Sequence, residues 1–422
     1  MKSTMKGPFQ IFSSKTKTTL ANYRITFFCL LITVVVLRGT TTGITSTPAP
    51  MQQLEQLPRQ KLALELEEKA RELVEEKETE WDPLVPFQLG PKISNWDEQR
   101  AVWLHNHPGA NMTAAGKPKV LLVTGSQPKQ CVNPMGNFQL LKAMKNKVDY
   151  CRLHDIEVYY NLAHLDLAMN SFWAKLPLLR KMMLTHPDVE WIWWMDSDAL
   201  FTDMTYEVPF ENFDNYNMIL NGRDDDVYNK KSWLGLNAGI FLVRNCQWTL
   251  DLIDVWAPMG PKGQVRYAFG KVLAEALSDR PEFESDDQSA LVYLLNKDRE
   301  RWGSKVMLET AVGLHGYWVM LVERYEELMA KGKPGAGGGE YRWPFVTHFV
   351  GCKPCGKGGD ESYAVDRCLK HMERAFNFAD NQILELYGFQ HDSLSTEAVH
   401  RVRPESSDPL KLMDQLKLKP KV

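Results

Sequence analysis

Two aspartates separated by one residue are the sharpest chemical feature of this sequence. Asp196 and Asp198 follow an apolar run at 189–195 that is typical of a buried strand. In an open parallel sheet, ligands collect beyond the carboxyl ends of the strands, where this pair would stand. Two carboxylates so close repel each other unless a cation neutralises them. A hard divalent ion does so, and it can bridge the carboxylates to a nucleotide pyrophosphate.

Asp-x-Asp also occurs by chance, usually in a surface turn. The chain supplies its own comparison in the run Arg223-Asp224-Asp225-Asp226, which stands in polar, loop-like sequence. We interpret that run as solvated. Asp196 and Asp198 differ because they follow an apolar strand, and we predict that they bind a metal ion.

A second polar group opens an apolar helix at Asp286, Asp287 and Gln288. Capping by Ser285 or Asp286 would satisfy the free amides of the first helical turn. Capping readily accounts for one such polar residue, but less readily for Asp286, Asp287 and Gln288 together. Further on, His315 and His348 stand in apolar surroundings. A lone histidine of this kind is usually a core or loop residue.

Strands and helices alternate around these residues. Apolar runs predict strands at 119–125, 157–160, 189–195, 216–220 and 239–243, and helical periodicity predicts helices at 172–185, from about Trp248 and from about Gln288. This alternation is typical of an α/β domain with a mostly parallel sheet. We expect the domain to span residues 81–398, with a flexible tail at 399–422.

The N-terminus predicts a membrane anchor. Residues 1–24 include basic but no acidic side chains, and an apolar run at 25–37 is closed by Arg38. The run is shorter than the ~20 residues that usually span a bilayer, but flanking Arg24 and Arg38 can extend it. We predict a cytoplasmic tail at 1–24, an uncleaved signal anchor at 25–38 and a luminal stem at 39–80. A cleaved signal peptide and a buried core helix are the alternatives.

The cysteines fit a luminal domain. Cys29 lies in the apolar run, and the six others could form disulfides in an oxidising compartment, although the sequence does not assign the pairs. A zinc cluster is the alternative for His348, Cys352, Cys355, Cys368 and His371, but its spacing is irregular. Asn111 opens a glycosylation sequon.

Composition narrows the classes of partner. The net charge of −3 and the sequence pI of about 6.4 give no basic footprint for nucleic acid. The thirteen tryptophans are compatible with a carbohydrate site but do not require one, because aromatic rings also fill protein cores.

Ordered sequence blocks over residues 90–400 resemble the plant xyloglucan 6-xylosyltransferases and the related galactomannan galactosyltransferases of glycosyltransferase family 34. Among these blocks are FWAKLPLLRKMM, WWMDSDALFTDM, GLNAG, WAPMGPKG, DDQSALVYLL, HGYW and VTHFVGCKPCGK. The resemblance implies a GT-A fold, Golgi residence as a type II membrane protein, a UDP-sugar donor, Mn²⁺ dependence and retention of anomeric configuration.

The resemblance also implies roles for single residues. Asp196, Asp198 and His348 would bind the metal ion, and Lys353 would contact the pyrophosphate. The donor site would include Gly125, Ser126, Ser197, His315 and Gly316, while Asp286, Asp287 and Gln288 would lie beneath the donor sugar as catalytic residues together with Lys353.

The expected activity is transfer of xylose from UDP-xylose to the 6-hydroxyl of glucose in a β-1,4-glucan. Asn221-Gly222-Arg223 and Ala238 depart from the xylosyltransferase pattern, so α-1,6-galactosyl transfer to a mannan is the alternative. An inactive scaffold subunit of a polysaccharide-synthesising complex is the alternative from another class. Association with itself or with related transferases fits any of these interpretations.

Overall fold

The computed structural model describes residues 87–169, 171–335, 341–356 and 363–403, all within one unit, Trp81–Val422. The expected cytoplasmic tail, anchor and stem lie outside the described residues, as do residues 404–422 of the expected C-terminal tail. No helix in the described part of the chain is long and apolar enough to cross a bilayer.

A six-stranded sheet forms the centre of the described part, in the order β2-β1-β3-β6-β5-β7. Only β6 runs antiparallel to its neighbours, and the other pairs are parallel, so the predicted mostly parallel α/β sheet is confirmed. The strands are β1 (Val120–Gly125), β2 (Glu157–Asn161), β3 (Trp191–Met195), β5 (Met218–Gly222), β6 (Leu236–Arg244) and β7 (Val306–Glu309).

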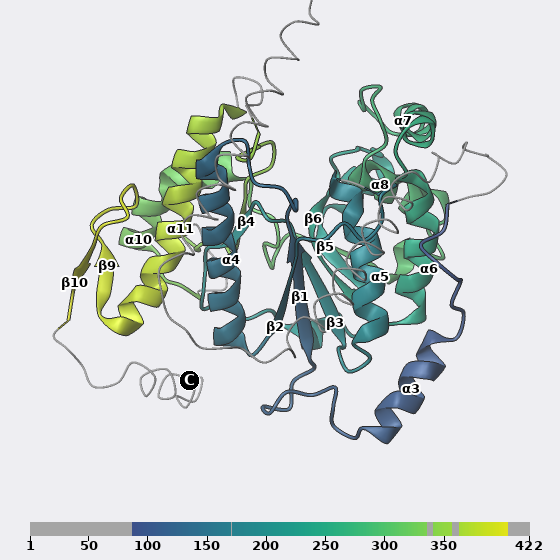
Figure 1. The fold of residues 1–422 in the computed structure, drawn as a ribbon, viewed down its shortest axis with the longest axis horizontal. Coiled ribbons are helices and arrows are strands. Elements are labelled where there is room, and N and C mark those ends of the chain that lie inside the picture. The colour runs from purple at the N-terminus through teal and green to yellow at the C-terminus, as the bar shows by residue number, and fades with distance from the viewer. Residues whose placement is uncertain (1–86, 170, 336–340, 357–362, 404–422) are drawn as a thin grey trace, which may run out of the picture. The chain divides into compact units, whose positions relative to one another are not determined.

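Helices cover both faces of this sheet (Figure 1). The described helices are α3 (Trp96–Asn106), α4 (Pro134–His154), α5 (Lys175–Thr185), α6 (Gln247–Trp256), α7 (Gln264–Ala276), α8 (Asp287–Lys297), α9 (Trp318–Leu321), α10 (Tyr325–Lys331) and α11 (Val365–Tyr387). Alternate residues of β1 serve the two faces, because successive strand side chains point in opposite directions. Leu121 and Val123 pack in the core that includes α5, α6 and α8, whereas Val120 and Leu122 pack in the core that includes α4 and α11.

The predicted helix at 172–185 begins later than expected. Ser171–Ala174 form a 3₁₀ turn, and α5 starts at Lys175. Pro177 therefore falls in the first turn of α5, where a missing backbone N–H leaves no intrahelical hydrogen bond unmade. The proline thus sets where the helix can begin.

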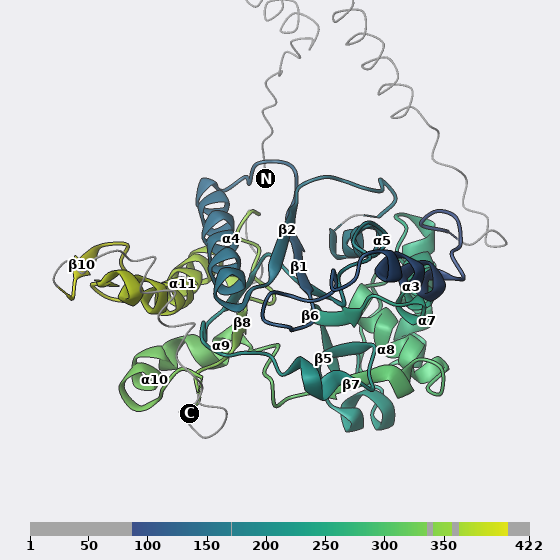
Figure 2. The ribbon, with the colours of Figure 1, turned by 90° about the horizontal axis from the view of Figure 1, so that it is seen from below.

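A small two-stranded sheet lies beside the large one. In it, β4 (Ala199–Phe201) pairs antiparallel with β8 (Val346–His348). Figure 2 shows β8, α9 and α10 on the same side of the molecule as α4 and α11. The chain continues into a hairpin of β9 (Phe389–His391) and β10 (Val399–Arg401), so residues of regular structure extend past 398, where the tail was expected to start.

Two disulfides join distant parts of the chain, Cys131 to Cys355 and Cys352 to Cys368. Cys151 and Cys246 are free thiols. The zinc alternative is therefore wrong, because three of its proposed ligands are oxidised. The disulfide expectation holds for four of the six cysteines.

Helix α4 fixes β4 from behind through Asn146. Its side-chain amide donates to the Phe201 carbonyl and accepts from the Phe201 N–H, both at 2.8 Å, and Asn146 is buried. We expect Asn146→Ala to lower the free energy of unfolding by about 2–4 kcal/mol, because two buried backbone groups lose their partner. Urea unfolding measures this change.

Arg152→Ala is the matched control, since Arg152 lies on the same helix and is exposed. Its effect should stay within about 0.5 kcal/mol. Equal effects of the two substitutions would show that the Asn146 bonds contribute nothing to the position of β4.

Candidate active site

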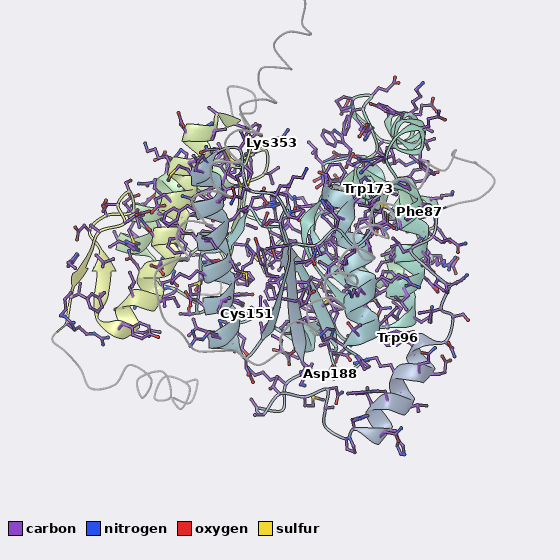
Figure 3. The ribbon with its side chains drawn as sticks, viewed as in Figure 1. Phe87, Trp96, Cys151, Trp173, Asp188 and Lys353 are labelled. Atoms are coloured by element: carbon purple, nitrogen blue, oxygen red, sulfur yellow. A yellow bond between two sulfur atoms is a disulfide. The ribbon has the colours of Figure 1, made fainter. Side chains whose placement is uncertain are left out.

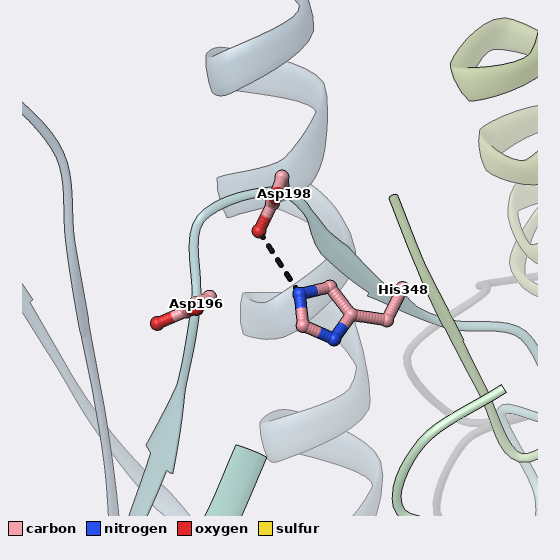
Figure 4. A group of neighbouring side chains, drawn as sticks. All are labelled: Asp196, Asp198 and His348. Atoms are coloured by element: carbon pink, nitrogen blue, oxygen red, sulfur yellow. Dashed lines mark ion pairs between the residues drawn. The ribbon is translucent and has the colours of Figure 1, made fainter. Parts of the chain in front are cut away.

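Three side chains that can bind a metal ion meet at the carboxyl end of β3. Asp196 follows β3, Asp198 precedes β4, and His348 ends β8 directly opposite Ala199. One ligand atom from each lies within 4.8 Å of the others (Figure 4). His348 Nε2 is 3.4 Å from an Asp198 carboxylate oxygen. Two carboxylates and an imidazole are a donor set that fits one divalent metal ion.

Gly239 in β6 leaves the space that this cluster needs. Its backbone carbonyl accepts from Asp196 N–H at 2.8 Å. A Cβ at position 239 would stand 2.4 Å from His348 Cε1 and 2.8 Å from Asp196 Oδ2. Any side chain there would push His348 or Asp196 away, which explains the glycine in Asn237-Ala238-Gly239.

His315 supports His348 from the side away from Asp198. The two Nδ1 atoms are 3.0 Å apart, so one must donate to the other. If His348 keeps Nε2 free for a metal, its Nδ1–H donates and His315 accepts. Burial, with a further effect of His348, lowers the pKa of His315 to about 3, so His315 is neutral.

Gly316 acts through its backbone. Its carbonyl accepts from His348 N–H at 2.8 Å. A Cβ at Gly316 would lie 2.3 Å from the Val346 carbonyl. His315 and Gly316, predicted as donor-site residues, thus hold His348 in place, and neither lines the cleft.

A cleft of about 440 Å³ opens beside the metal cluster. This is the size range of small-ligand sites. Its walls include the end of β1, the Asp-Ser-Asp turn and the segment around Lys353, and the predicted residues among them are Gly125, Ser126, Asp196, Ser197, Asp198 and Lys353. Figure 3 shows Lys353 at this edge of the sheet, far from Asp188, which precedes β3.

Ser126 is held in the cleft wall by the neighbouring strand. Its hydroxyl lies 2.7 Å from the Tyr160 hydroxyl, and its N–H donates to the Asn161 carbonyl. A Cβ at Gly125 would stand 2.7 Å from that same carbonyl. Gly125 and Ser126, predicted as donor-site residues, both line the cleft in this turn.

Lys175 is a site residue that the sequence analysis did not identify. Its buried ammonium lies 2.7 Å from an Asp287 oxygen and 3.6 Å from an Asp196 oxygen, and it donates to the Ala238 carbonyl. Burial alone would lower its pKa, but Asp196 and Asp287 raise it overall. The available signal was a lysine inside an apolar helical segment, because a buried lysine requires a charged partner.

The three predicted residues at the start of α8 have different roles. Asp286 is the helix cap, with one oxygen accepting from Ser289 N–H and the other from Arg280. Burial raises the pKa of Asp287 to about 6, against the opposing effect of Lys175. Gln288 accepts from Ala238 N–H and donates to the Trp233 carbonyl. None of the three lines the cleft, but Gln288 bonds to Ala238, and Asp287 pairs with Lys175, which does line the cleft.

One predicted site, Asn111, and the acidic run predicted to be solvated both lie apart from the cleft. Asn111 is partly exposed in the loop before β1. Asp225 and Asp226 both pair with Lys230, and Asp225 is 61 % exposed. The interpretation of the Asp224–Asp226 run as solvated is consistent with these surface ion pairs.

Known proteins match the chain over most of its length. The sequence model of the galactosyl transferase GMA12/MNN10 family matches residues 116–358. Xyloglucan 6-xylosyltransferase 2 of Arabidopsis thaliana is 52% identical over an alignment of 434 residues, which covers 94% of this chain and 93% of the relative. Xyloglucan 6-xylosyltransferase 1 of the same plant is 58% identical over 334 residues, 79% of this chain and 72% of the relative. A probable xyloglucan 6-xylosyltransferase 1 of Oryza sativa subsp. indica is 54% identical over an alignment of 421 residues, which covers 94% of this chain and 92% of the relative.

The protein combines a mostly parallel α/β sheet with two aspartates and a histidine beside a cleft. Together with these matches, this makes it a glycosyltransferase. The chain belongs to the galactosyl transferase GMA12/MNN10 family, glycosyltransferase family 34. The family resemblance expected from the sequence blocks is confirmed.

Gly239→Ala tests the metal cluster without removing a ligand. We expect the affinity for Mn²⁺ to fall about 10- to 100-fold, as when a residue that orients a metal ligand is changed, because the new methyl group displaces His348 or Asp196. Titration calorimetry with Mn²⁺ measures the affinity. Ser197→Ala, in the same turn, is the control and should bind Mn²⁺ as the wild type does. Equal Mn²⁺ affinity in both variants would contradict the assignment of the cluster.

Proposed function

We propose that this chain is a retaining xylosyltransferase that moves xylose from UDP-xylose to the 6-hydroxyl of glucose in a β-1,4-glucan. The observation that supports this most strongly is the meeting of Asp196, Asp198 and His348 beside the cleft that Lys353 also lines. Three relatives at 52–58% identity that are named for xyloglucan 6-xylosyl transfer supply the substrate class.

Asp196, Asp198 and His348 would hold Mn²⁺. The ion, when bound, supplies positive charge that stabilises the developing negative charge of the UDP leaving group. Lys353, exposed at the rim of the same cleft, adds a second positive charge for the pyrophosphate. Ser126 and Gly125 lie where the nucleotide would enter.

Retention follows from attack on the same face of the sugar. The bond between the sugar C1 and the β-phosphate oxygen breaks with its electrons leaving on phosphate. The acceptor's 6-hydroxyl oxygen then forms a bond to C1, and its proton passes to the departing phosphate oxygen. The alternative is a double displacement with Asp287 or Gln288 as nucleophile. The ion pair of Asp287 with buried Lys175 and the backbone bonds of Gln288 favour the first route.

Asp287 and Lys175 have an electrostatic role in this scheme. Because Lys175 lies between Asp196 and Asp287, it sets one positive charge against both carboxylates and fixes them relative to Ala238. A negative charge at Asp287 would stabilise the positive charge that develops on the sugar ring. Arg280, which pairs with Asp286, keeps that second carboxylate in its capping position.

Several further features belong to the same proposal. We infer a GT-A fold for residues 81–398, a Golgi type II anchor at 25–38 that places this domain in the lumen, and glycosylation at Asn111. The order of the six strands supports the fold. The two disulfides support the luminal compartment, because disulfides persist in an oxidising environment. Association with related transferases through the stem is compatible with this topology.

Comparing donors and acceptors tests the central proposal. The full-length chain with Mn²⁺ should transfer from UDP-xylose to cello-oligosaccharides faster than from UDP-galactose to manno-oligosaccharides, and Asp198→Ala should lose at least about 100-fold of the rate. The Asn221-Gly222-Arg223 and Ala238 departures favour the galactose pair as the second candidate. Faster galactosyl transfer would replace the donor assignment, while equal UDP release by wild type and Asp198→Ala would favour an inactive scaffold.

The rate should depend on pH through Asp287. Its pKa of about 6 lies above the ordinary aspartate value because of burial. The raised value means that Asp287 gains a proton as the pH falls through about 6, where an ordinary aspartate stays ionised. We expect kcat to decrease below that pH in the wild type and to be low and nearly flat between pH 5 and 7 in Asp287→Asn.

Asp224→Asn, at an exposed position, is the control for this profile and should keep the wild-type acidic limb. The same acidic limb in Asp287→Asn would assign the titration to another group.

A further inference from the structure

The segment that contains Lys353 is cross-linked on both sides. Cys352, directly before the lysine, bonds to Cys368 in the first turn of α11. Cys355, two residues after it, bonds to Cys131 just before α4. Only Lys353 and Pro354 stand between the two attachment points, and proline has a fixed φ.

The start of α4 packs directly on this segment. Val132 N–H donates to the Cys355 carbonyl at 3.0 Å. A Cβ at Gly136, in the first turn of α4, would lie 2.4 Å from the Pro354 carbonyl, so only a glycine allows this approach. Pro354 is buried, whereas Lys353 beside it is exposed. The backbone of Lys353 is thus fixed while its side chain remains open to the cleft.

The same segment is connected to the metal cluster. Phe349, which follows the metal ligand His348, donates its N–H to the Asp198 carbonyl at 3.0 Å, and Cys352 N–H donates to the Phe349 carbonyl. Residues 349–356 form no helix or strand. Two disulfides and a few backbone hydrogen bonds therefore fix the backbone of this segment, whereas strands β3 and β4 fix the backbone around Asp196 and Asp198.

We propose that the Cys131–Cys355 and Cys352–Cys368 disulfides are positioning elements for donor binding, which hold Lys353 at the cleft so that its ammonium meets the diphosphate of the nucleotide. This inference rests on the proposed use of a UDP-sugar. A lysine side chain is long and flexible, so the cost of ordering it falls when its backbone is already fixed. Cys352 and Cys355 also line the cleft, and the proposed effect of the disulfides on donor binding passes through Lys353.

Pairwise removal of the cysteines tests this positioning role. The variants are Cys131→Ala/Cys355→Ala and Cys352→Ala/Cys368→Ala, and Cys246→Ala, a free thiol, is the control. UDP affinity with Mn²⁺ is measured by calorimetry, donor KM and kcat by transfer assays, and folding by the thermal midpoint. We expect each pair to weaken UDP binding and raise the donor KM about 10-fold, the size of one charge-assisted hydrogen bond, with kcat changing much less.

Removing the disulfides in a Lys353→Ala variant separates their effect on the position of Lys353 from their effect on general stability. Lys353→Ala alone should weaken UDP binding by a similar factor, and removing either disulfide in Lys353→Ala should then cost little more. A full additional loss in that background would overturn the proposal, as would a lower thermal midpoint with unchanged UDP affinity. Wild-type chain that binds no UDP would overturn this proposal and the proposed function together, whereas wild-type binding with unaffected variants would overturn this proposal alone.

Reduction of the folded wild type covers variants that fail to fold. Each disulfide takes up two electrons and two protons from dithiothreitol, giving two thiols and the cyclic disulfide of the reagent. The thiols are capped with iodoacetamide, the reagents are removed, and UDP is titrated with Mn²⁺; protein alkylated without reduction is the control. Weaker UDP binding in proportion to alkylated Cys352 and Cys355 supports the proposal, and unchanged binding after full alkylation overturns it.

Discussion

Asp196 and Asp198 stand close together at the end of β3, and the domain sets buried lysines against these two carboxylates. Lys175 approaches Asp196 from α5. On the α4 side, buried Lys147 donates to the Ala199 carbonyl at 2.7 Å, and burial lowers its pKa to about 8 against the opposing effect of Asp198 and Asp196. Positive charge inside a low-dielectric core acts more strongly than charge in water. The two helices that cover opposite faces of the sheet thus both stabilise the metal-binding turn from within.

The metal site also depends on pairing between distant segments. His348 reaches the aspartates only because β8 pairs with β4 in a register that sets it opposite Ala199. A shift of that register by one residue would turn the imidazole to the other face of the small sheet. Asn146 fixes β4, and His315 and Gly316 fix His348. The disulfide-linked segment 349–356 follows His348 directly in the chain. The Asp196, Asp198 and His348 cluster and the Lys353 segment therefore share one framework on the α4 and α11 side.

The parts of this arrangement that lie in local sequence were predictable. An apolar run followed by Asp196 and Asp198 predicted both the strand and the ligand edge, and capping by Asp286 was among the local alternatives. Contacts between distant segments were not. His348 came only from family resemblance, the disulfide partners of Cys352 and Cys355 have no local signal, and Lys175 looks like one polar residue in an apolar helix. Lys175 has its role only because α5 brings it to Ala238 and Asp287. Hydrophobic periodicity within the helix cannot predict such a contact between distant segments.

The start of β6 shows how these constraints bear on donor choice. Gly239 cannot gain a side chain without displacing His348 or Asp196. Ala238 has its N–H bonded to Gln288 and its carbonyl bonded to Lys175, so its backbone cannot move without disturbing both. Its buried methyl group is the part that can change while the backbone keeps its bonds. Xylose and galactose differ by one hydroxymethyl group, a difference that a single pocket side chain can discriminate by about 1–3 kcal/mol. Ala238 itself does not line the cleft, so a change at position 238 would reach the cleft through Lys175, which bonds to its carbonyl and does line the cleft.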